Sequence, residues 1–122
     1  MHEMSLMSEI IEIVSEDAAE RGFKKVDQID VIVGDLSNVL PDALELAFLF
    51  FQRQEGSVID EDSRLHIIRE EAKARCPACQ CDFQPDYRIA LCPECGVPGS
   101  LVVSGETFRV ESYEGRDGDD EN

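Results

Sequence analysis

The sequence predicts an α/β (α+β) protein in which two helices pack on a small three-stranded sheet, with an inserted four-cysteine, zinc-ribbon-like module. Two segments repeat apolar residues with a helical period, and three alternate apolar and polar residues as strands do. Two Cys-x-x-Cys units lie between the last two strands. We therefore expect an α/β domain over residues 1–73 and 103–113, a zinc-binding domain over residues 74–102 and a disordered acidic tail over residues 114–122.

The first half of the chain predicts a helix and then a strand. Residues 4–21 form an amphipathic helix, because apolar residues recur on one face at Met7, Ile10, Ile11, Val14 and Ala18. Gly22 follows and is typical of a helix stop. Residues 25–33 then alternate, with Ile29, Val31 and Val33 on one side, and Gly34 closes this strand.

The second half predicts another helix and two further strands. The helix covers residues 41–53, because Pro41 suits the first turn and Asp42 lies at the positive end of the helix dipole. Its apolar residues surround the axis, so we expect burial on more than one side. Residues 64–71 and 107–113 alternate as strands. These two strands flank the Cys-rich insert and can pair as the stem of a long hairpin.

Composition narrows the class of protein. The chain has 122 residues, with 27 acidic and 11 basic side chains and a net charge of −16. This charge argues against a nucleic acid or an anionic membrane as partner, and favours a cation or a basic protein surface. No apolar run approaches the ~20 residues that span a bilayer, and the start does not resemble an export signal. We expect a cytoplasmic protein.

The cysteines predict a metal site. Cys76 and Cys79 form one Cys-x-x-Cys unit, and Cys92 and Cys95 form the other. Each unit folds as a tight knuckle that aims both sulfurs at one point, and two facing knuckles make a tetrahedral site. Structural Zn(II) is favoured over a rubredoxin-like iron centre, because four thiolates leave no open position. Cys81 is a fifth thiol, and we interpret it as a bystander.

The beginning of the chain offers a different set of metal ligands. The α-amine of Met1, the backbone amide and imidazole of His2 and the side chain of Glu3 lie close together along the chain. Amine, deprotonated amide and imidazole nitrogens in a planar array favour Ni(II) or Cu(II) over Zn(II). Glu3 can supply an oxygen or stabilise the helix N-terminus. His66, in a predicted strand, is interpreted as exposed or hydrogen-bonded to a neighbour.

These features together resemble one protein family. The Met1-His2-Glu3 start, the Gly56-Ser57-Val58 turn and the two Cys-x-x-Cys units before a final strand are similar to the nickel metallochaperones of hydrogenase maturation, the HypA/HybF family. The resemblance covers residues 1 to about 113. Some members have histidines beside the zinc cysteines, whereas this chain has none there. Mechanisms that exchange histidine for cysteine on zinc are therefore not expected.

The resemblance implies a function, partners and site residues. It implies a cytoplasmic protein that delivers Ni(II) to the large subunit of [NiFe]-hydrogenase, works with a nickel-handling maturation GTPase and in some members serves urease maturation. It implies His2 as the key nickel ligand, with Glu3 and the Met1 amine beside it. It also implies structural Zn(II) on the four cysteines of the two units. No nucleic acid or membrane partner is implied.

Two alternative functions come from other classes. A zinc-ribbon protein–protein adaptor would need the cysteines but would give His2 no role. An enzyme would need a nucleophile, a base and an orienting group, and the sequence shows no such set. We therefore name no catalytic residue and expect a protein that is not an enzyme.

Overall fold

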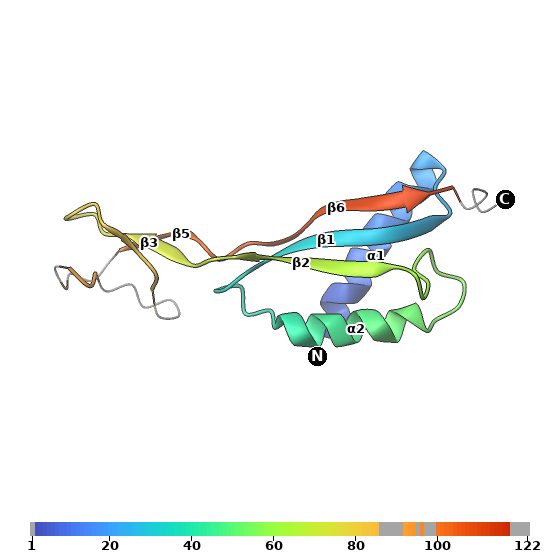
Figure 1. Cartoon of the computed structure of the whole chain (residues 1–122), viewed down its shortest axis with the longest axis horizontal. Helices are drawn as coiled ribbons and strands as arrows, with labels where there is room; N and C mark the ends of the chain where they lie inside the picture. The colour runs from blue at the N-terminus through green and yellow to red at the C-terminus, as the bar shows by residue number, and fades with distance from the viewer. Residues whose placement is uncertain (1, 86–91, 95, 97–99, 118–122) are drawn as a thin grey trace. The chain divides into compact units, whose positions relative to one another are not determined.

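The computed structural model describes residues 2–85, 92–94, 96 and 100–117, with the side chain of His2 outside the description. Its elements are α1 (His2–Arg21), β1 (Lys25–Gly34), α2 (Pro41–Gln52), β2 (Arg64–Glu70), β3 (Lys73–Arg75), β4 (Asp82–Phe83), β5 (Leu101–Ser104) and β6 (Phe108–Arg116) (Figure 1). The predicted class is confirmed: two helices accompany a three-stranded sheet, and a Cys-rich segment lies between β2 and β6.

Helix α1 begins two residues earlier than the periodicity predicted and ends where it predicted. Its apolar face is buried, at Met7, Ile10, Val14 and Ala18. At its end, the N–H of Gly22 donates to Ala19 at 3.2 Å and the N–H of Phe23 donates to Ala18 at 2.9 Å. Gly22 has φ +82°, so this is a Schellman stop, which needs a residue without a Cβ penalty.

Strand β1 is the centre of the first sheet, whose order is β2-β1-β6. Its inward residues Ile29 and Val31 are fully buried. The N–H of Gly34 donates to Thr107 and the N–H of Lys24 donates to Arg116, so β1 and β6 run antiparallel. The prediction that the strands flanking the insert pair with each other was wrong. The strand with the most buried apolar side chains takes the middle, and the more polar β2 and β6 take the edges.

Helix α2 is less buried than its composition predicted. Leu44, Ala47 and Phe48 are buried, but Leu46, Leu49 and Phe50 remain about half or more exposed. This helix of 12 residues packs against α1 and buries only one of its sides. The remaining apolar residues therefore form a stripe on the surface. These residues raise the mean hydropathy of the helix, although they are not buried.

A second sheet, of order β4-β3-β5, was not predicted. Its strands are two to four residues long, too short for an alternation pattern to stand out. Strand β3 pairs antiparallel with both neighbours, with Ala74 opposite Phe83 and opposite Val102. The stem that carries the cysteine segment is therefore formed by β3 and β5. It is not formed by β2 and β6, which correspond to the two strands that were predicted to pair.

The carboxylate of Glu70, at the end of β2, is a junction between segments far apart in sequence. It accepts hydrogen bonds from the N–H of Gly105 at 2.8 Å, from the N–H of Thr107 at 3.1 Å and from the hydroxyl of Thr107 at 3.0 Å. The backbones also approach closely here, because a Cβ on Gly34 would overlap the carbonyl group of Gly105. One side chain therefore anchors the turn from β5 into β6.

The chain divides into two compact units. The first comprises residues 1–31, 39–67 and 110–122, and the second comprises residues 32–38 and 68–109. The narrower zinc-binding module predicted over residues 74–102 remains a prediction. Strand β6 continues to Arg116, three residues into the segment expected to be a tail, and the guanidinium of Arg116 pairs there with Asp27 at 2.7 Å. Across the described part of the chain, no helix has the length and apolarity needed to cross a membrane.

Candidate metal centres

The first cysteine knuckle is positioned by β3 and β4. Cys76 follows the end of β3, and its N–H donates to the carbonyl of Cys81, just before β4, at 3.0 Å. The N–H of Gln80 donates to the carbonyl of Cys76 at 2.9 Å. Gln80 has φ +63°, a left-handed conformation that a non-glycine residue adopts at some cost. The turn that aims Cys79 therefore imposes its geometry on the residue after it.

The second knuckle repeats this geometry. The N–H of Gly96 donates to the carbonyl of Cys92 at 2.8 Å, and Gly96 has φ +68°. In both knuckles the residue after the second cysteine is left-handed and donates back to the first cysteine. Gly96 adopts this conformation at little steric cost because it has no Cβ, whereas Gln80 does not share that freedom. Cys95, the predicted fourth zinc ligand, lies outside the described residues.

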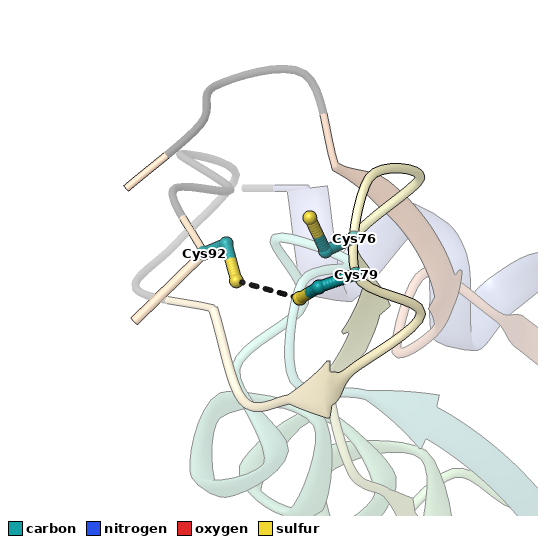
Figure 2. A group of neighbouring side chains, drawn as sticks. All are labelled: Cys76, Cys79 and Cys92. Carbon is teal, nitrogen blue, oxygen red and sulfur yellow. Dashed lines mark hydrogen bonds between the residues drawn. The ribbon is translucent and has the colours of Figure 1, made fainter. Parts of the chain in front are cut away.

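Three thiols converge between the knuckles. The sulfurs of Cys76, Cys79 and Cys92 all lie within 4.8 Å of one another, and those of Cys79 and Cys92 are 3.6 Å apart (Figure 2). Four sulfurs at ~2.3 Å from a Zn(II) ion stand about 3.8 Å from one another in a tetrahedron. The observed spacing therefore fits a tetrahedral thiolate site. Cys76 and Cys92 are buried and Cys79 is exposed.

Cys81 lies beside this arrangement, and its thiol is within hydrogen-bonding reach of Cys79. It is not a member of the converging group, and its thiol points to the carbonyl of Asp82 at 3.7 Å. Its carbonyl accepts the N–H of Cys76, so it helps to close the first knuckle. Asp82 itself forms a two-bond ion pair with Arg75, at 2.7 and 3.2 Å. This pair joins β3 and β4 just outside the cysteines.

At the other predicted site, α1 begins at His2. Met1 and the imidazole of His2, two of the predicted nickel ligands, lie outside the description. Glu3 is placed: its Oε2 accepts a hydrogen bond from the backbone N–H of Leu40 at 3.2 Å. Leu40 is the N-cap of α2, so the two helices begin next to each other. The local sequence pattern did not predict this contact, because its two partners are 37 positions apart.

His66 lies on β2 and its Nδ1 is 3.2 Å from Oδ1 of Asp30. The hydroxyl of Ser112 donates to the other oxygen of Asp30 at 3.0 Å. Burial raises the pKa of Asp30, but hydrogen bonds from Gln28, Ser112 and His66 outweigh it, so this pKa lies below its ordinary value. Ser112 and His66 both contact the carboxylate of Asp30 rather than each other. These three residues therefore lack the serine–histidine contact that activates a nucleophile.

The chain matches one family model over residues 1–115, described as hydrogenase/urease nickel incorporation, metallochaperone, hypA. Among curated proteins, it is 34% identical to hydrogenase maturation factor HypA of Moorella thermoacetica, with 94% of this chain and 99% of that protein covered. It is 37% identical to the HypA protein of Geobacter metallireducens, with 93% and 98% covered.

Solved structures of HypA proteins are also similar to this chain. A solution structure of a HypA protein superposes with a TM-score of 0.67 at 26% identity, covering 96% of this chain and 98% of the other. The solution structure of the Ni metallochaperone HypA from Helicobacter pylori superposes with a TM-score of 0.61 at 25% identity, covering 93% and 97%. Both likenesses extend over nearly the whole of each chain.

Proposed function

Because the chain belongs to the HypA family of hydrogenase/urease nickel-incorporation metallochaperones, we propose that it binds Ni(II) at its N-terminus, through His2 with Met1 and Glu3, and delivers it for [NiFe]-hydrogenase maturation. The observation that carries this proposal is the start of α1 at His2. The first four N–H groups of a helix have no intrahelical acceptor, so the amide of His2 is not consumed by the helix.

The chemistry of the donors suits a transient cargo. The α-amine of Met1, the amide nitrogen of His2 and its imidazole are neighbours that close small chelate rings, and such nitrogens favour Ni(II) over Zn(II). These donors must lose protons to bind, so affinity should fall as pH drops toward the imidazole pKa of ~6.5. A site at the end of the chain is open to a second protein's ligands, which suits release by ligand exchange.

Structural Zn(II) is proposed for the four cysteines. The convergence of Cys76, Cys79 and Cys92 supports it, and Cys95 completes the second Cys-x-x-Cys unit. A bound metal would supply folding free energy to a segment with few large apolar side chains. A closed thiolate site also leaves no position for a substrate, so we propose no enzymatic activity.

The partners are proposed from the family. We propose a nickel-handling maturation GTPase as co-worker and the [NiFe]-hydrogenase large subunit as recipient, with urease maturation proteins as a second route. Neither nucleic acid nor membrane is proposed, because the net charge of −16 repels nucleic acids and anionic membrane surfaces. We propose a cytoplasmic location, where cysteines stay reduced and available to a metal.

The test is calorimetric titration with Ni(II) of the zinc-loaded protein that starts at Met1. His2→Ala should abolish tight binding because it removes the imidazole. An N-terminal Gly-Ser extension should also abolish tight binding, because it converts the Met1 amine into a peptide nitrogen. Circular dichroism should show an unchanged fold. His66→Ala is the matched control and should bind like wild type. Undiminished nickel binding by His2→Ala would overturn the proposal and favour the zinc-ribbon adaptor.

A further inference from the structure

The N-terminus of α2 lacks a cap of its own. Its N-cap residue is Leu40, which makes no side-chain capping hydrogen bond, and Pro41 follows as the first helical residue. In a capping box, a Glu or Gln three residues after the N-cap accepts the N-cap N–H. Here that position is Ala43, whose side chain cannot accept a hydrogen bond. The acceptor has to come from elsewhere in the chain.

Glu3 supplies it. Its Oε2 accepts the N–H of Leu40 at 3.2 Å, so a residue in the first turn of α1 completes the capping box of α2. Figure 1 shows the beginning of α1 beside α2. The carboxylate thereby lies at the N-terminal ends of two helices, whose exposed N–H groups and dipoles attract an acceptor oxygen. The contact holds the backbone of residue 3, and with it the start of the helix at His2.

We infer that Glu3 is a positioning residue of the nickel site: its carboxylate fixes the terminal chelate against α2 instead of entering the coordination shell. This inference rests on the proposed nickel site at residues 1–3 and assigns one of its members a different role. A carboxylate that accepts a backbone N–H and neutralises two helix N-termini gives up these interactions if it turns toward a metal. A chelate of amine, amide and imidazole does not need it.

The role of Glu3 is then to reduce the entropy lost on binding. Residues 1–3 of an unanchored chain would fray, and nickel would have to order them. Ordering one residue's backbone corresponds to roughly a tenfold change in an equilibrium constant. The contact between Glu3 and Leu40 meets part of this cost during folding. Nickel affinity and protection of the Leu40 amide should therefore rise together, since coupling between two equilibria is reciprocal.

The test compares Glu3→Gln with Glu3→Ala in zinc-loaded protein that starts at Met1. Glutamine keeps an oxygen at the same reach that can accept the Leu40 N–H, but it is a poor metal ligand. We expect Glu3→Gln to bind Ni(II) within about threefold of wild type, and Glu3→Ala to bind about tenfold more weakly. The nickel d–d absorption band should be the same in all three, because the ligand set does not change. Glu9→Ala, which removes an exposed carboxylate from α1, is the matched control.

A second variant breaks the contact from the other side. Leu40→Pro removes the donor N–H and leaves Glu3 intact, and the φ of −90° at Leu40 is near proline's range. It should weaken nickel binding as much as Glu3→Ala, and the double variant should weaken it no further. Amide exchange in wild-type protein should slow at Leu40 when nickel is added.

Three results would overturn the inference. Equal loss of affinity in Glu3→Gln and Glu3→Ala, with a shifted d–d band, would make the carboxylate a ligand. Wild-type affinity in Glu3→Ala would remove any positioning role. Wild-type affinity in Leu40→Pro would show that Glu3 acts by another route. Failure of the nickel site itself is distinguished by His2→Ala, which must abolish tight binding for the comparison of Glu3 variants to bear on positioning.

Discussion

Removing the carboxylate of Glu70 should cost this protein a large part of its stability. Glu70→Ala leaves three donors without their acceptor: the N–H groups of Gly105 and Thr107 and the hydroxyl of Thr107. Hydrogen bonds to a charged group contribute about 1.5–3 kcal/mol each when buried. The site is only partly buried, so we take about 1 kcal/mol for each bond and expect a loss of about 3 kcal/mol. With an m-value of about 2 kcal/mol/M in urea, the midpoint should fall by about 1.5 M.

The hydrogen bonds to Glu70 also make the stability of the protein depend on pH. Burial raises the pKa of Glu70, but the hydrogen bonds from Thr107 and Gly105 and the nearby charge of Arg109 lower it by more, so the pKa lies below its ordinary value. A carboxyl whose pKa is depressed by folding stabilises the protein fully above its unfolded pKa of ~4.3. This contribution is lost as pH falls from there through the folded pKa. Acid should therefore weaken wild type more than Glu70→Gln.

The assay is urea unfolding followed by circular dichroism on zinc-loaded protein, at pH 7 and at steps below pH 4.5. Glu70→Gln keeps one oxygen acceptor and should lose about 1 kcal/mol at pH 7. Glu71→Ala is the control, because within the described ranges the carboxylate of Glu71 hydrogen-bonds just once, at a long 3.4 Å, to the side-chain amide of exposed Gln84. A midpoint for Glu70→Ala equal to that of Glu71→Ala would refute the reasoning, as would an unchanged acid slope in Glu70→Gln.

Three pairs of substitutions test the backbone and the cysteines. Gly34→Ala should lower stability by about 3 kcal/mol or more in thermal unfolding, because the new Cβ overlaps the Gly105 carbonyl group, whereas Gly56→Ala meets no atom within 4 Å and should lose less. Gln80→Gly should raise the melting temperature of the zinc-loaded protein, because it removes the steric cost of a left-handed non-glycine residue, about 1 kcal/mol. Gly96→Ala should lower the melting temperature by a similar amount, because it introduces that cost. Equal shifts of one sign would contradict this. Cys81→Ser should keep one zinc per chain by metal analysis while Cys76→Ala loses it, and zinc loss in Cys81→Ser would make that thiol a ligand.

Elements with many regularly spaced apolar residues were predictable. The face of α1 through Met7 and Val14 and the alternation of β1 at Ile29 and Val31 correspond to buried positions. The surface stripe at Leu46 and Phe50 was not predictable, because hydropathy measures what a side chain prefers and not how many neighbours surround it. The short strands β3, β4 and β5 exist through their pairing partners and the cysteine turns between them, which a local pattern does not contain.

The two candidate metal sites differ in how far their residues could be predicted. A Cys-x-x-Cys spacing predicts a turn, so the approach of Cys76 to Cys79 follows from local geometry, whereas the approach of Cys92 from the other unit was predicted from the ligand count of a tetrahedral metal site. The identity of the acceptor for Leu40 does not, since Glu3 lies in another helix. The absence of an acidic side chain at Ala43 was the visible signal that α2 needed help from outside. Long-range capping of this kind depends on the packing of α1 against α2, which pattern reasoning cannot supply.

The hairpin of β3 and β5 also bears on how fast the chain folds. Residues 71–107 separate β2 from β6, and β6 must return to pair with β1. Closing a flexible loop of this length costs about 3 kcal/mol, whereas a loop already tied off by the hairpin and its cysteine knuckles costs about 1 kcal/mol. A nascent chain that captures zinc early therefore crosses a lower barrier, by up to about thirtyfold in rate. With the proposed zinc site, zinc supply during synthesis would then set how quickly the sheet of β2, β1 and β6 is completed.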